Sequence, residues 1–466
     1  MHPGAPRTIA IVGAGFSGTL VTVNLLRRPP VESTRIVLIE REPEVGRGIA
    51  YARRDYRYIL NVPASRMSAT STAPDEFLEF ARTRIPDATG QDFLPREVYG
   101  DYLRELLDRS AAKAAPSIRL ELLNDSVTEV RQLVDGAGFR LMLERGGELN
   151  ADDVVLAPGN PPPRVPPEAE AVRTLPGYVN DPWAKLHHAP AAGPVLIIGS
   201  GLTMVDVVCA TVATEPACTI HVLSRHGLLP LSQTDIGAAA VEEGELDRAL
   251  KPATSLRSIV RAIANVARRA TADHRDWRDV IMQVRHRAPA IWNSLTLDDR
   301  RRFLRHVRAY WDVHRHRFPE PIRSRLEHLE ASGQLTIHAG RLRQLEAAGS
   351  QIRVRWRARG ERDERTMLVN GIHNCSGPDY DLSRSAEPLW RSLLKSGLTT
   401  LDELHLGLRT GPRGELLGRN GLATHGLYYV GPMLRASHWE ATAVAELRGH
   451  AERLADELAR PLPQSR

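Results

Sequence analysis

The stretch Thr8-Ile-Ala-Ile-Val-Gly-Ala-Gly-Phe-Ser-Gly18 decides the fold. A short apolar strand leads into three glycines, and a helical run then continues to Leu26, which is the order of the dinucleotide-binding fingerprint. Gly13 allows the tight turn, Gly15 lets backbone amides approach a pyrophosphate, and Gly18 lets the helix pack closely on the strand. The N-terminus of that helix offers N–H groups and a positive dipole end to the phosphates. The pattern predicts a dinucleotide site at the start of the chain.

An acidic residue follows the next predicted strand. The run Arg35-Ile-Val-Leu-Ile39 ends in Glu40. A carboxylate at this place accepts hydrogen bonds from both ribose hydroxyls of an adenine dinucleotide that has no 2′-phosphate. Glycine turns in other α/β folds imitate an isolated GxGxxG motif, so the interpretation depends on strand, turn, helix, second strand and acid occurring together.

A second and looser copy of the motif lies near the middle of the chain. A buried strand precedes Gly199 and Gly201, but Met204 replaces the third glycine. The following strand ends in Ser224 and Arg225 instead of an acid. An arginine can pair with a 2′-phosphate and a serine can hydrogen-bond to it, so the second site is predicted to prefer NADPH over NADH. The alternative is that Arg225 is an ordinary surface charge.

The segments that follow the two loops resemble one another. Each contains short strands and then an apolar strand that ends in glycine, at Gly159 in the first series and at Gly377 in the second. This internal repeat predicts an α/β fold with two Rossmann-like dinucleotide-binding domains. The expected boundaries are 1–164 and 376–466 for the first domain, and 165–375 for the second, with a helical insert at about 245–329.

The composition is that of a soluble globular enzyme. The 466 residues are 42% hydrophobic and 25% charged, which excludes a disordered chain, a collagen-like fibre and a coiled coil. The net charge of +6 arises from 62 basic and 56 acidic side chains, too small an excess to argue for nucleic-acid binding. No stretch reaches the roughly 18 apolar residues that a membrane span needs. We expect no nucleic-acid partner, no membrane partner and a cytoplasmic location.

The cysteines and histidines do not form a recognisable redox or metal site. Cys209, Cys218 and Cys375 are too scattered for a disulfide framework or a zinc site. A disulfide reductase needs two redox cysteines a few residues apart, so these three are interpreted as buried structural thiols. His187 and His188 form a lone pair in a loop, and no metal is expected.

Between about 245 and 329 the pattern becomes helical and basic. One predicted helix face carries Phe303, Val307, Tyr310, Trp311 and His314. This face is either packed core, with His314 as a core histidine, or a substrate wall at which His314, Arg315 and Arg317 meet an acidic substrate or the cofactor phosphates. Further candidates for the entrance of the site are His226 and Asp235.

Eight motifs run in order along nearly the whole chain. They are Gly46-Arg-Gly-Ile-Ala-Tyr51, Leu60-Asn-Val-Pro63, Pro95-Arg-Glu-Val-Tyr-Gly100, Leu156-Ala-Pro-Gly-Asn160, Gly199-Ser-Gly-Leu-Thr-Met-Val-Asp206, Tyr310-Trp-Asp-Val-His-Arg-His-Arg317, Asn374-Cys-Ser-Gly-Pro378 and Trp439-Glu440. In these motifs the chain resembles a bacterial family of FAD-NAD(P)-binding proteins, related to flavin-dependent monooxygenases with two dinucleotide-binding domains.

The resemblance implies FAD at the first loop and NADPH at the second. Asn61 resembles a position close to the isoalloxazine ring, and Gly431, Pro432 and a helix from about Trp439 resemble the element that closes the flavin site. Pro432 departs from the aspartate that many such flavoproteins place on the ribityl chain. The expected cofactor-binding residues are Gly13, Gly15, Phe16, Ser17, Gly18, Glu40, Arg41, Asn61, Ala157, Gly159, Gly199, Gly201, Leu202, Thr203, Ser224, Arg225, Gly377, Gly431, Pro432 and Trp439.

The resemblance further implies a FAD-dependent, NADPH-using oxidoreductase. The preferred hypothesis is a monooxygenase that transfers oxygen from O₂ to a small metabolite through a C4a-(hydro)peroxyflavin. The stretch 175–183 lacks the histidine of the signature of Baeyer–Villiger and N-oxygenating relatives. Two alternatives stay open: an NAD(P)H:acceptor oxidoreductase without oxygen insertion, and a non-catalytic FAD sensor. A homo-oligomer is compatible with the sequence, no general base is assigned, and the catalytic candidates are Asn61, His314 and Arg315.

Overall fold

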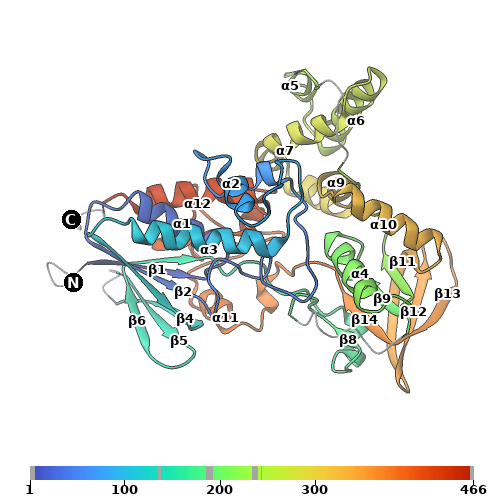
Figure 1. Ribbon diagram of the computed structural model, residues 1–466, viewed down its shortest axis with the longest axis horizontal. Helices are drawn as coiled ribbons and strands as arrows, with labels where there is room; N and C mark the ends of the chain where they lie inside the picture. The colour runs from blue at the N-terminus through green and yellow to red at the C-terminus, as the bar shows by residue number, and fades with distance from the viewer. Residues whose placement is uncertain (1–5, 135–137, 185–192, 234–239, 243, 462–466) are drawn as a thin grey trace. The chain divides into compact units, whose positions relative to one another are not determined.

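The computed structural model describes residues 6–134, 138–184, 193–233, 240–242 and 244–461. The chain divides into two compact units (Figure 1): unit 1 comprises Met1–Asn160 and Tyr380–Arg466, and unit 2 comprises Pro161–Asp379. The chain therefore enters the second unit before the expected boundary at 164/165 and leaves it after the expected boundary at 375/376. None of the helices among the described residues combines the length and apolar character needed to cross a lipid bilayer.

Unit 1 is built on a six-stranded sheet with the order β15-β16-β7-β1-β2-β3. Its apolar central strands are buried on both faces, as expected where helices or further strands cover each side of a parallel sheet. All neighbouring strands run parallel except the edge strand β15. The strands are β1 (Arg7–Val12), β2 (Thr34–Ile39), β3 (Ile118–Leu123), β7 (Asp153–Leu156), β15 (Glu415–Leu417) and β16 (Ala423–Tyr429).

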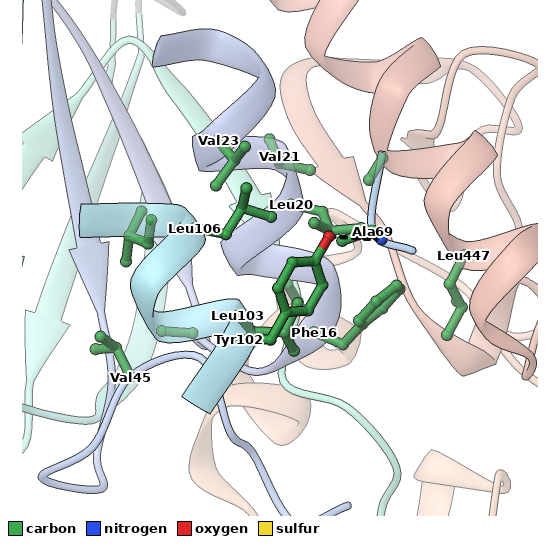
Figure 2. Close-up of a cluster of buried hydrophobic side chains, with 14 of the residues drawn as sticks. Phe16, Leu20, Val21, Val23, Val45, Ala69, Tyr102, Leu103, Leu106 and Leu447 are labelled. Carbon is green, nitrogen blue, oxygen red and sulfur yellow. Dashed lines mark hydrogen bonds between the residues drawn. The ribbon is translucent and has the colours of Figure 1, made fainter. Parts of the chain in front are cut away.

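Helices pack on one face of this sheet. They are α1 (Phe16–Arg27), α2 (Glu76–Arg82), α3 (Arg96–Ala112) and α12 (Val444–Leu458), and a short 3₁₀ turn, η1, lies at Ala64–Arg66. Figure 2 shows side chains of α1, such as Leu20, meeting Leu103 and Leu106 of α3 and Leu447 of α12 in one buried apolar cluster. The burial of these aliphatic side chains fixes α1, and with it the glycine loop that precedes α1.

The opposite face of the sheet is covered by a three-stranded antiparallel meander and by α11. Phe139 and Leu141 of the meander and Trp390 and Leu393 of α11 share one apolar cluster with β1 and β7. The C-terminal part of this unit also contains two short 3₁₀ turns. These elements are β4 (Val127–Gln132), β5 (Phe139–Leu143), β6 (Glu148–Ala151), η4 (Leu382–Arg384), α11 (Pro388–Ser396) and η5 (Pro432–Ala436).

Unit 2 contains a seven-stranded sheet with the order β13-β12-β11-β10-β9-β14-β8. The strands β11, β10, β9, β14 and β8 lie side by side in that order and are parallel to one another. The strand β12 pairs antiparallel with both β11 and β13. The elements are η2 (Pro167–Val172), β8 (Tyr178–Val179), β9 (Val195–Ile198), α4 (Leu202–Thr214), β10 (Ile220–Ser224), β11 (Leu335–Ala348), β12 (Gln351–Ala358), β13 (Glu364–Val369) and β14 (Gly371–Asn374).

The helical insert is the connection between β10 and β11. Ser255, Asp276 and Thr296 cap three of its helices with side-chain hydrogen bonds. Its apolar cluster includes Leu246, Val266 and Val280, so the insert has a small core of its own. The helices are α5 (Glu245–Leu250), α6 (Leu256–Ala272), α7 (Trp277–Ser294), α8 (Leu297–Arg302), the π-helical turn η3 (Phe303–Val307), α9 (Arg308–Arg315) and α10 (Glu320–Ala331). The predicted α/β fold with two Rossmann-like units and a helical insert is confirmed.

Candidate functional site

The first glycine loop is shaped by close backbone contacts that admit no side chain. Gly13 has a φ of +99°, and a Cβ built on it would lie 2.4 Å from the carbonyl oxygen of Ala157. A Cβ on Gly18 would lie 1.9 Å from the carbonyl oxygen of Gly13. Helix α1 begins after Gly15, and no side chain caps its first N–H groups. The loop can therefore present backbone N–H groups to a diphosphate, which fits the pyrophosphate of FAD.

Glu40 lies at the mouth of this loop. Its Oε2 accepts a hydrogen bond from the N–H of Ala14 at 2.7 Å, and its Oε1 accepts one from the N–H of Glu42 at 3.1 Å. A carboxylate has about four acceptor positions, so these two bonds orient Glu40 and leave capacity for ribose hydroxyls. The expected acid at the end of β2 is thus held beside the glycine loop.

Within unit 1, another loop, from Gly46 to Gly48, lies against the first glycine loop. The N–H of Gly46 donates to the carbonyl oxygen of Ala14 at 2.7 Å, and a Cβ built on Gly15 would lie 3.5 Å from the Cα of Gly48. Between these glycines, the buried guanidinium of Arg47 pairs with Glu44 at 2.6 Å and also with Asp101. Sequence reasoning assigned no role to this loop, although the motif Gly46-Arg-Gly48 marked it.

Aromatic side chains pack around the first turn of α1. Phe16 stacks on Tyr99, with 6.3 Å between ring centroids, and Tyr51 lies 4.6 Å from Tyr99. Burial raises the pKa of Tyr51 to about 12, so its phenol is neutral near pH 7. The side chains of Phe16 and Ser17 are buried, so their contacts to a cofactor would come from their backbone N–H groups. Phe16, Tyr99 and Tyr102 belong to the buried apolar cluster of unit 1, and Figure 2 shows Phe16 and Tyr102 in it.

The second glycine loop repeats the first. Gly199 has a φ of +102°, and its Cβ would lie 2.4 Å from the carbonyl oxygen of Cys375. In unit 1 the N–H of Ala157 donates to Val12, and in unit 2 the N–H of Cys375 donates to Ile198, both at 2.8 Å. The counterpart of Gly18 is Met204, which is fully buried.

The first turn of α4 is also open at its N-terminus. Gly201 precedes α4 without a side-chain cap, and a Cβ built on it would meet nothing within 4 Å. Leu202 and Thr203 are half-buried in this first turn. The uncapped N–H groups of α4 can present hydrogen-bond donors to a diphosphate, as those of α1 can.

Ser224 and Arg225 differ in their surroundings: the Ser224 hydroxyl is hydrogen-bonded within the protein, whereas the Arg225 side chain is exposed. The Ser224 Oγ lies 3.0 Å from the Ser200 Oγ and accepts a hydrogen bond from the N–H of Gly227 at 3.0 Å, so it stabilises the turn after β10. Arg225 is exposed. A guanidinium at this position is compatible with a 2′-phosphate, whereas the serine hydroxyl is already used within the turn.

Two glycines follow the strands that carry the chain between the units. Gly159 has a φ of +80° and Gly377 a φ of +89°, and a Cβ on either would meet nothing within 4 Å. Gly377 belongs to unit 2, because that unit ends at Asp379. The expected boundaries instead place it in the C-terminal part of the FAD-binding domain.

The element after β16 differs from the expected one. Gly431 has a φ of +147°, and Pro432 opens the short turn η5. The helix expected from about Trp439 begins only at Val444, because residues 437–443 form turns and irregular structure. Trp439 is buried, and the guanidinium carbon of Arg435 lies 3.8 Å from its ring centroid. This cation–π pair fixes the backbone that follows Gly431.

Asn61 and Arg41 lie on loops of unit 1. A bridge between Ile59 and Pro95 and a hydrogen bond from the N–H of Leu60 to the carbonyl oxygen of Leu94 at 2.8 Å fix the segment that carries Asn61. The guanidinium of Arg41 is exposed and pairs with Glu387 at 3.7 Å.

The predicted helix face in the insert is not continuous. The π-helical turn η3 changes the residue spacing ahead of α9, so a strict helical period overextends the face. In α9, Tyr310 is 44% exposed while Trp311 packs against the core of the insert. His314 donates from Nδ1 to the carbonyl oxygen of Tyr310 at 2.7 Å. No side chain of α9 is fully buried, and all of them except Tyr310 are half-buried.

The remaining candidate residues from this region differ in how deeply they are buried. Arg315 is half-buried, and Arg317, which follows α9, is buried. His226 is half-buried beside Arg225, with its ring centroid 5.9 Å from that of Tyr310. Asp235 and the pair His187 and His188 lie outside the described residues.

The three cysteines are described residues; each is buried and outside any disulfide bond. Burial raises the pKa of Cys218 to about 11 and raises the pKa of Cys375 above its usual range. Thiol–disulfide exchange requires an accessible thiolate, so these cysteines are unsuited to it. Over the described part of the chain, no group of three or more potential metal ligands occurs.

Comparison with known proteins agrees with this geometry. Residues 10–161 match the FAD-NAD(P)-binding family model. No curated protein matches the chain. The expected resemblance to FAD-NAD(P)-binding proteins is confirmed on this segment, which carries the first glycine loop, Glu40 and the Gly46 to Gly48 loop.

Solved structures share the fold over nearly the whole chain. The reduced ornithine hydroxylase of Pseudomonas aeruginosa is 15% identical with a TM-score of 0.64, covering 98% of this chain and 99% of that chain. L-lysine 6-monooxygenase of Pseudomonas syringae is 17% identical with a TM-score of 0.64, covering 97% and 99%. An ornithine N-hydroxylase of Kutzneria sp. 744, solved with reduced FAD, NADP⁺ and L-ornithine, is 13% identical with a TM-score of 0.61, covering 97% and 99%. At these identities the likeness shows the two-domain flavoprotein fold.

Proposed function

We propose that the protein is a FAD-dependent, NADPH-using oxidoreductase that acts as a monooxygenase on a small metabolite. The observation that carries this proposal is a pair of similarly built glycine loops with oppositely charged residues beside them. In each unit, the charged residue follows the strand that comes next in the chain after the glycine loop and its helix. The first loop holds Glu40, which suits an unphosphorylated ribose, and the second is followed by Arg225, which suits a phosphorylated one. Two loops with opposite charge preferences are best explained by two different dinucleotides.

In this proposal each loop performs one binding task. The N-terminus of α1 and the Gly46 to Gly48 loop enclose the diphosphate of FAD, and Glu40 accepts from the adenosine ribose. The N-terminus of α4 holds the diphosphate of NADPH. Bound FAD supplies the redox chemistry, and the protein supplies binding, orientation and exclusion of water.

Two observations favour oxygen transfer over disulfide reduction. The buried cysteines lack the accessible thiolate that disulfide exchange needs. The fold is more similar to that of an ornithine hydroxylase and an L-lysine 6-monooxygenase, with a TM-score of 0.64 for each, than to that of a bacillithiol disulfide reductase, with a TM-score of 0.55. A nucleophilic nitrogen of a small amine is therefore the first substrate class to test, with molecular oxygen as co-substrate. Free thiols also suit the cytoplasm, which we propose as the compartment.

The first experiment tests the cofactors. Purified protein should carry FAD, and its flavin absorbance should bleach on anaerobic mixing with NADPH faster than with an equal concentration of NADH. Protein that stays colourless and cannot be reconstituted with FAD contradicts the whole proposal.

The second experiment separates oxygen insertion from electron transfer. The reduced protein is mixed with O₂ and, in separate reactions, with ornithine, lysine and other small amines, and the products are examined by mass spectrometry and by peroxide assay. A product that gains one oxygen atom supports the monooxygenase. Stoichiometric hydrogen peroxide with every amine, together with rapid reduction of an added quinone, supports the acceptor oxidoreductase instead.

A further inference from the structure

Three segments of unit 2 converge on Ala339, a residue of β11 near the carboxyl end of β10. Ala339 pairs with Ser224, the last residue of β10. A Cβ built on Gly227 would lie 3.0 Å from the Cβ of Ala339, so the loop after β10 touches this point. The N–H of Arg359, in the turn after β12, donates to the carbonyl oxygen of Ala339 at 2.9 Å. The loop after β10 and the turn after β12 are therefore neighbours.

Each of these segments contributes one exposed arginine. Arg225 directly follows Ser224, Arg341 is two residues beyond Ala339 on β11, and Arg359 is hydrogen-bonded to Ala339 through its backbone. Arg225 belongs to the turn that sequence reasoning assigned to a phosphate, whereas Arg341 and Arg359 come from a hairpin to which it gave no role.

A glycine makes this convergence possible. At Gly340 the strand β11 leaves β10 as its partner and takes up β12. A Cβ on Gly340 would lie 2.6 Å from the carbonyl oxygen of Arg357 and 2.8 Å from the ring of Trp356. Only glycine lets β12 approach this closely, so Gly340 sets where the turn carrying Arg359 lies.

The three arginines differ from their neighbours in their ion pairing. On the same hairpin Arg353 pairs with Glu346 at 3.8 Å, and Arg355 pairs with Glu364 at 2.8 Å. Within the described residues, by contrast, no carboxylate forms an ion pair with the three arginines that surround Ala339, namely Arg225, Arg341 and Arg359. No carboxylate of the described residues therefore compensates their positive charge in an ion pair.

The pKa of His226 is affected by the positive charges of Arg225, Arg341 and Arg359. Its pKa is lowered from the usual value by burial and then by Arg359, Arg225 and Arg341, in that order. The imidazole therefore stays neutral near pH 7. One residue is thus exposed to the charge of all three arginines, which agrees with their backbone arrangement around Ala339.

We propose that Arg341 and Arg359 complete, with Arg225, a site for the 2′-phosphate of NADPH. This inference rests on the proposed function and adds two specificity-determining residues from the β11–β12 hairpin. A phosphate monoester carries nearly two negative charges and three acceptor oxygens near pH 7, and guanidinium groups match it with paired hydrogen bonds. NADH lacks this group, so the cluster discriminates between the two nucleotides.

The experiment measures binding without turnover. The probes are 2′,5′-ADP, which carries the 2′-phosphate, and 5′-AMP, which lacks it, titrated by calorimetry into the FAD-loaded protein. Arg341→Gln and Arg359→Gln should each weaken 2′,5′-ADP binding about tenfold and leave 5′-AMP binding within about twofold. Arg353→Gln removes the same charge from the same hairpin and is the matched control, since its arginine already has a carboxylate partner.

The outcomes separate this inference from the proposed function. Unchanged 2′,5′-ADP binding in both variants, or an equal loss in Arg353→Gln, overturns the inference. Wild-type protein that binds 2′,5′-ADP and 5′-AMP equally while NADPH still bleaches its flavin also overturns the inference alone. Wild-type protein that binds neither probe and is not reduced by NADPH overturns the proposed function itself.

Discussion

The carboxylate of Glu40 accepts a hydrogen bond from the N–H of Ala14 at 2.7 Å, which ties the end of β2 to the turn after β1. The same carboxylate is proposed to receive the ribose hydroxyls of FAD. Glu40 therefore stabilises the loop without a cofactor, and in the proposed function the same side chain would also contact FAD.

Replacing Glu40 should weaken FAD binding. Glu40→Ala removes the acceptor for both the loop and the ribose, so the dissociation constant for FAD should rise about 10- to 100-fold, since two hydrogen bonds to a charged group are lost. The measurement is the flavin retained per protein after gel filtration, followed by titration of the apoprotein with FAD. Glu42→Ala is the control, because its exposed side chain is adjacent; an equal loss in both variants would contradict the role of Glu40.

Alanine at the two glycines of the second loop should have different effects. Gly199→Ala places a Cβ 2.4 Å from a backbone oxygen at a positive φ, so it should lower the midpoint of thermal unfolding. A Cβ on Gly201 meets nothing within 4 Å, so Gly201→Ala should fold normally and lose only nucleotide affinity. Thermal unfolding and binding of 2′,5′-ADP distinguish the two. Normal nucleotide affinity in Gly201→Ala would show that the diphosphate does not approach this glycine closely.

The buried ion pair at the start of the chain should contribute more to stability than an exposed one. Arg7 pairs with Asp153 at 2.7 Å, and both side chains are buried. Because Arg7→Ala leaves a buried carboxylate without its partner, the free energy of unfolding should fall by about 3–5 kcal/mol. Arg28 forms an exposed pair with Asp456, also at 2.7 Å, and Arg28→Ala should cost less than about 1 kcal/mol. Equal costs in urea unfolding would contradict this difference.

His373 should make the stability of the protein depend on pH. Burial lowers the pKa of this β14 histidine to about 4, and neither ring nitrogen has a hydrogen-bond partner among the described residues. The unfolded chain takes up the proton near its ordinary pKa of about 6.5. The contribution of His373 to the free energy of unfolding should therefore be constant above pH 6.5. As the pH falls from 6.5 towards 4, this contribution should decrease by about 3 kcal/mol in total.

Two variants test this origin of the pH dependence. His373→Gln keeps a polar side chain but cannot titrate, so unfolding should lose part of its slope between pH 6.5 and 4. His373→Leu should also raise stability near pH 7, because it removes the unpaired imidazole from this buried position. His450, whose pKa burial lowers to about 3, supplies a second contribution that both variants retain. A slope that is unchanged in His373→Gln would refute the role of His373.

Local patterns predicted much of the fold. The glycine turns of both loops, the strand before each, and the acid after β2 are contiguous in sequence, so their geometry follows from short-range rules. The predicted placement of Arg225 after β10 is of the same kind. The charge contrast between Glu40 and Arg225 therefore follows from the amino-acid sequence alone.

Features that depend on long-range contact were not predicted. Arg341 and Arg359 join Arg225 only because β11 changes partner at Gly340, which no local pattern reveals. The π-helical turn Phe303–Val307 breaks a helical period that the spacing of apolar residues continues. The helix expected near Trp439 starts later, and what holds the preceding segment is a contact between Trp439 and Arg435.

Unit 1 draws its strands from both ends of the chain, and this has a consequence during synthesis on the ribosome. The strand β16 lies between β7 and β15 in its sheet, and the guanidinium of Arg7 donates to the carbonyl oxygens of Leu458 and Arg460. Every residue of unit 2 emerges before β16 does. The nascent chain can therefore complete unit 2 while unit 1 still lacks one interior strand of its sheet, until β16 is synthesised.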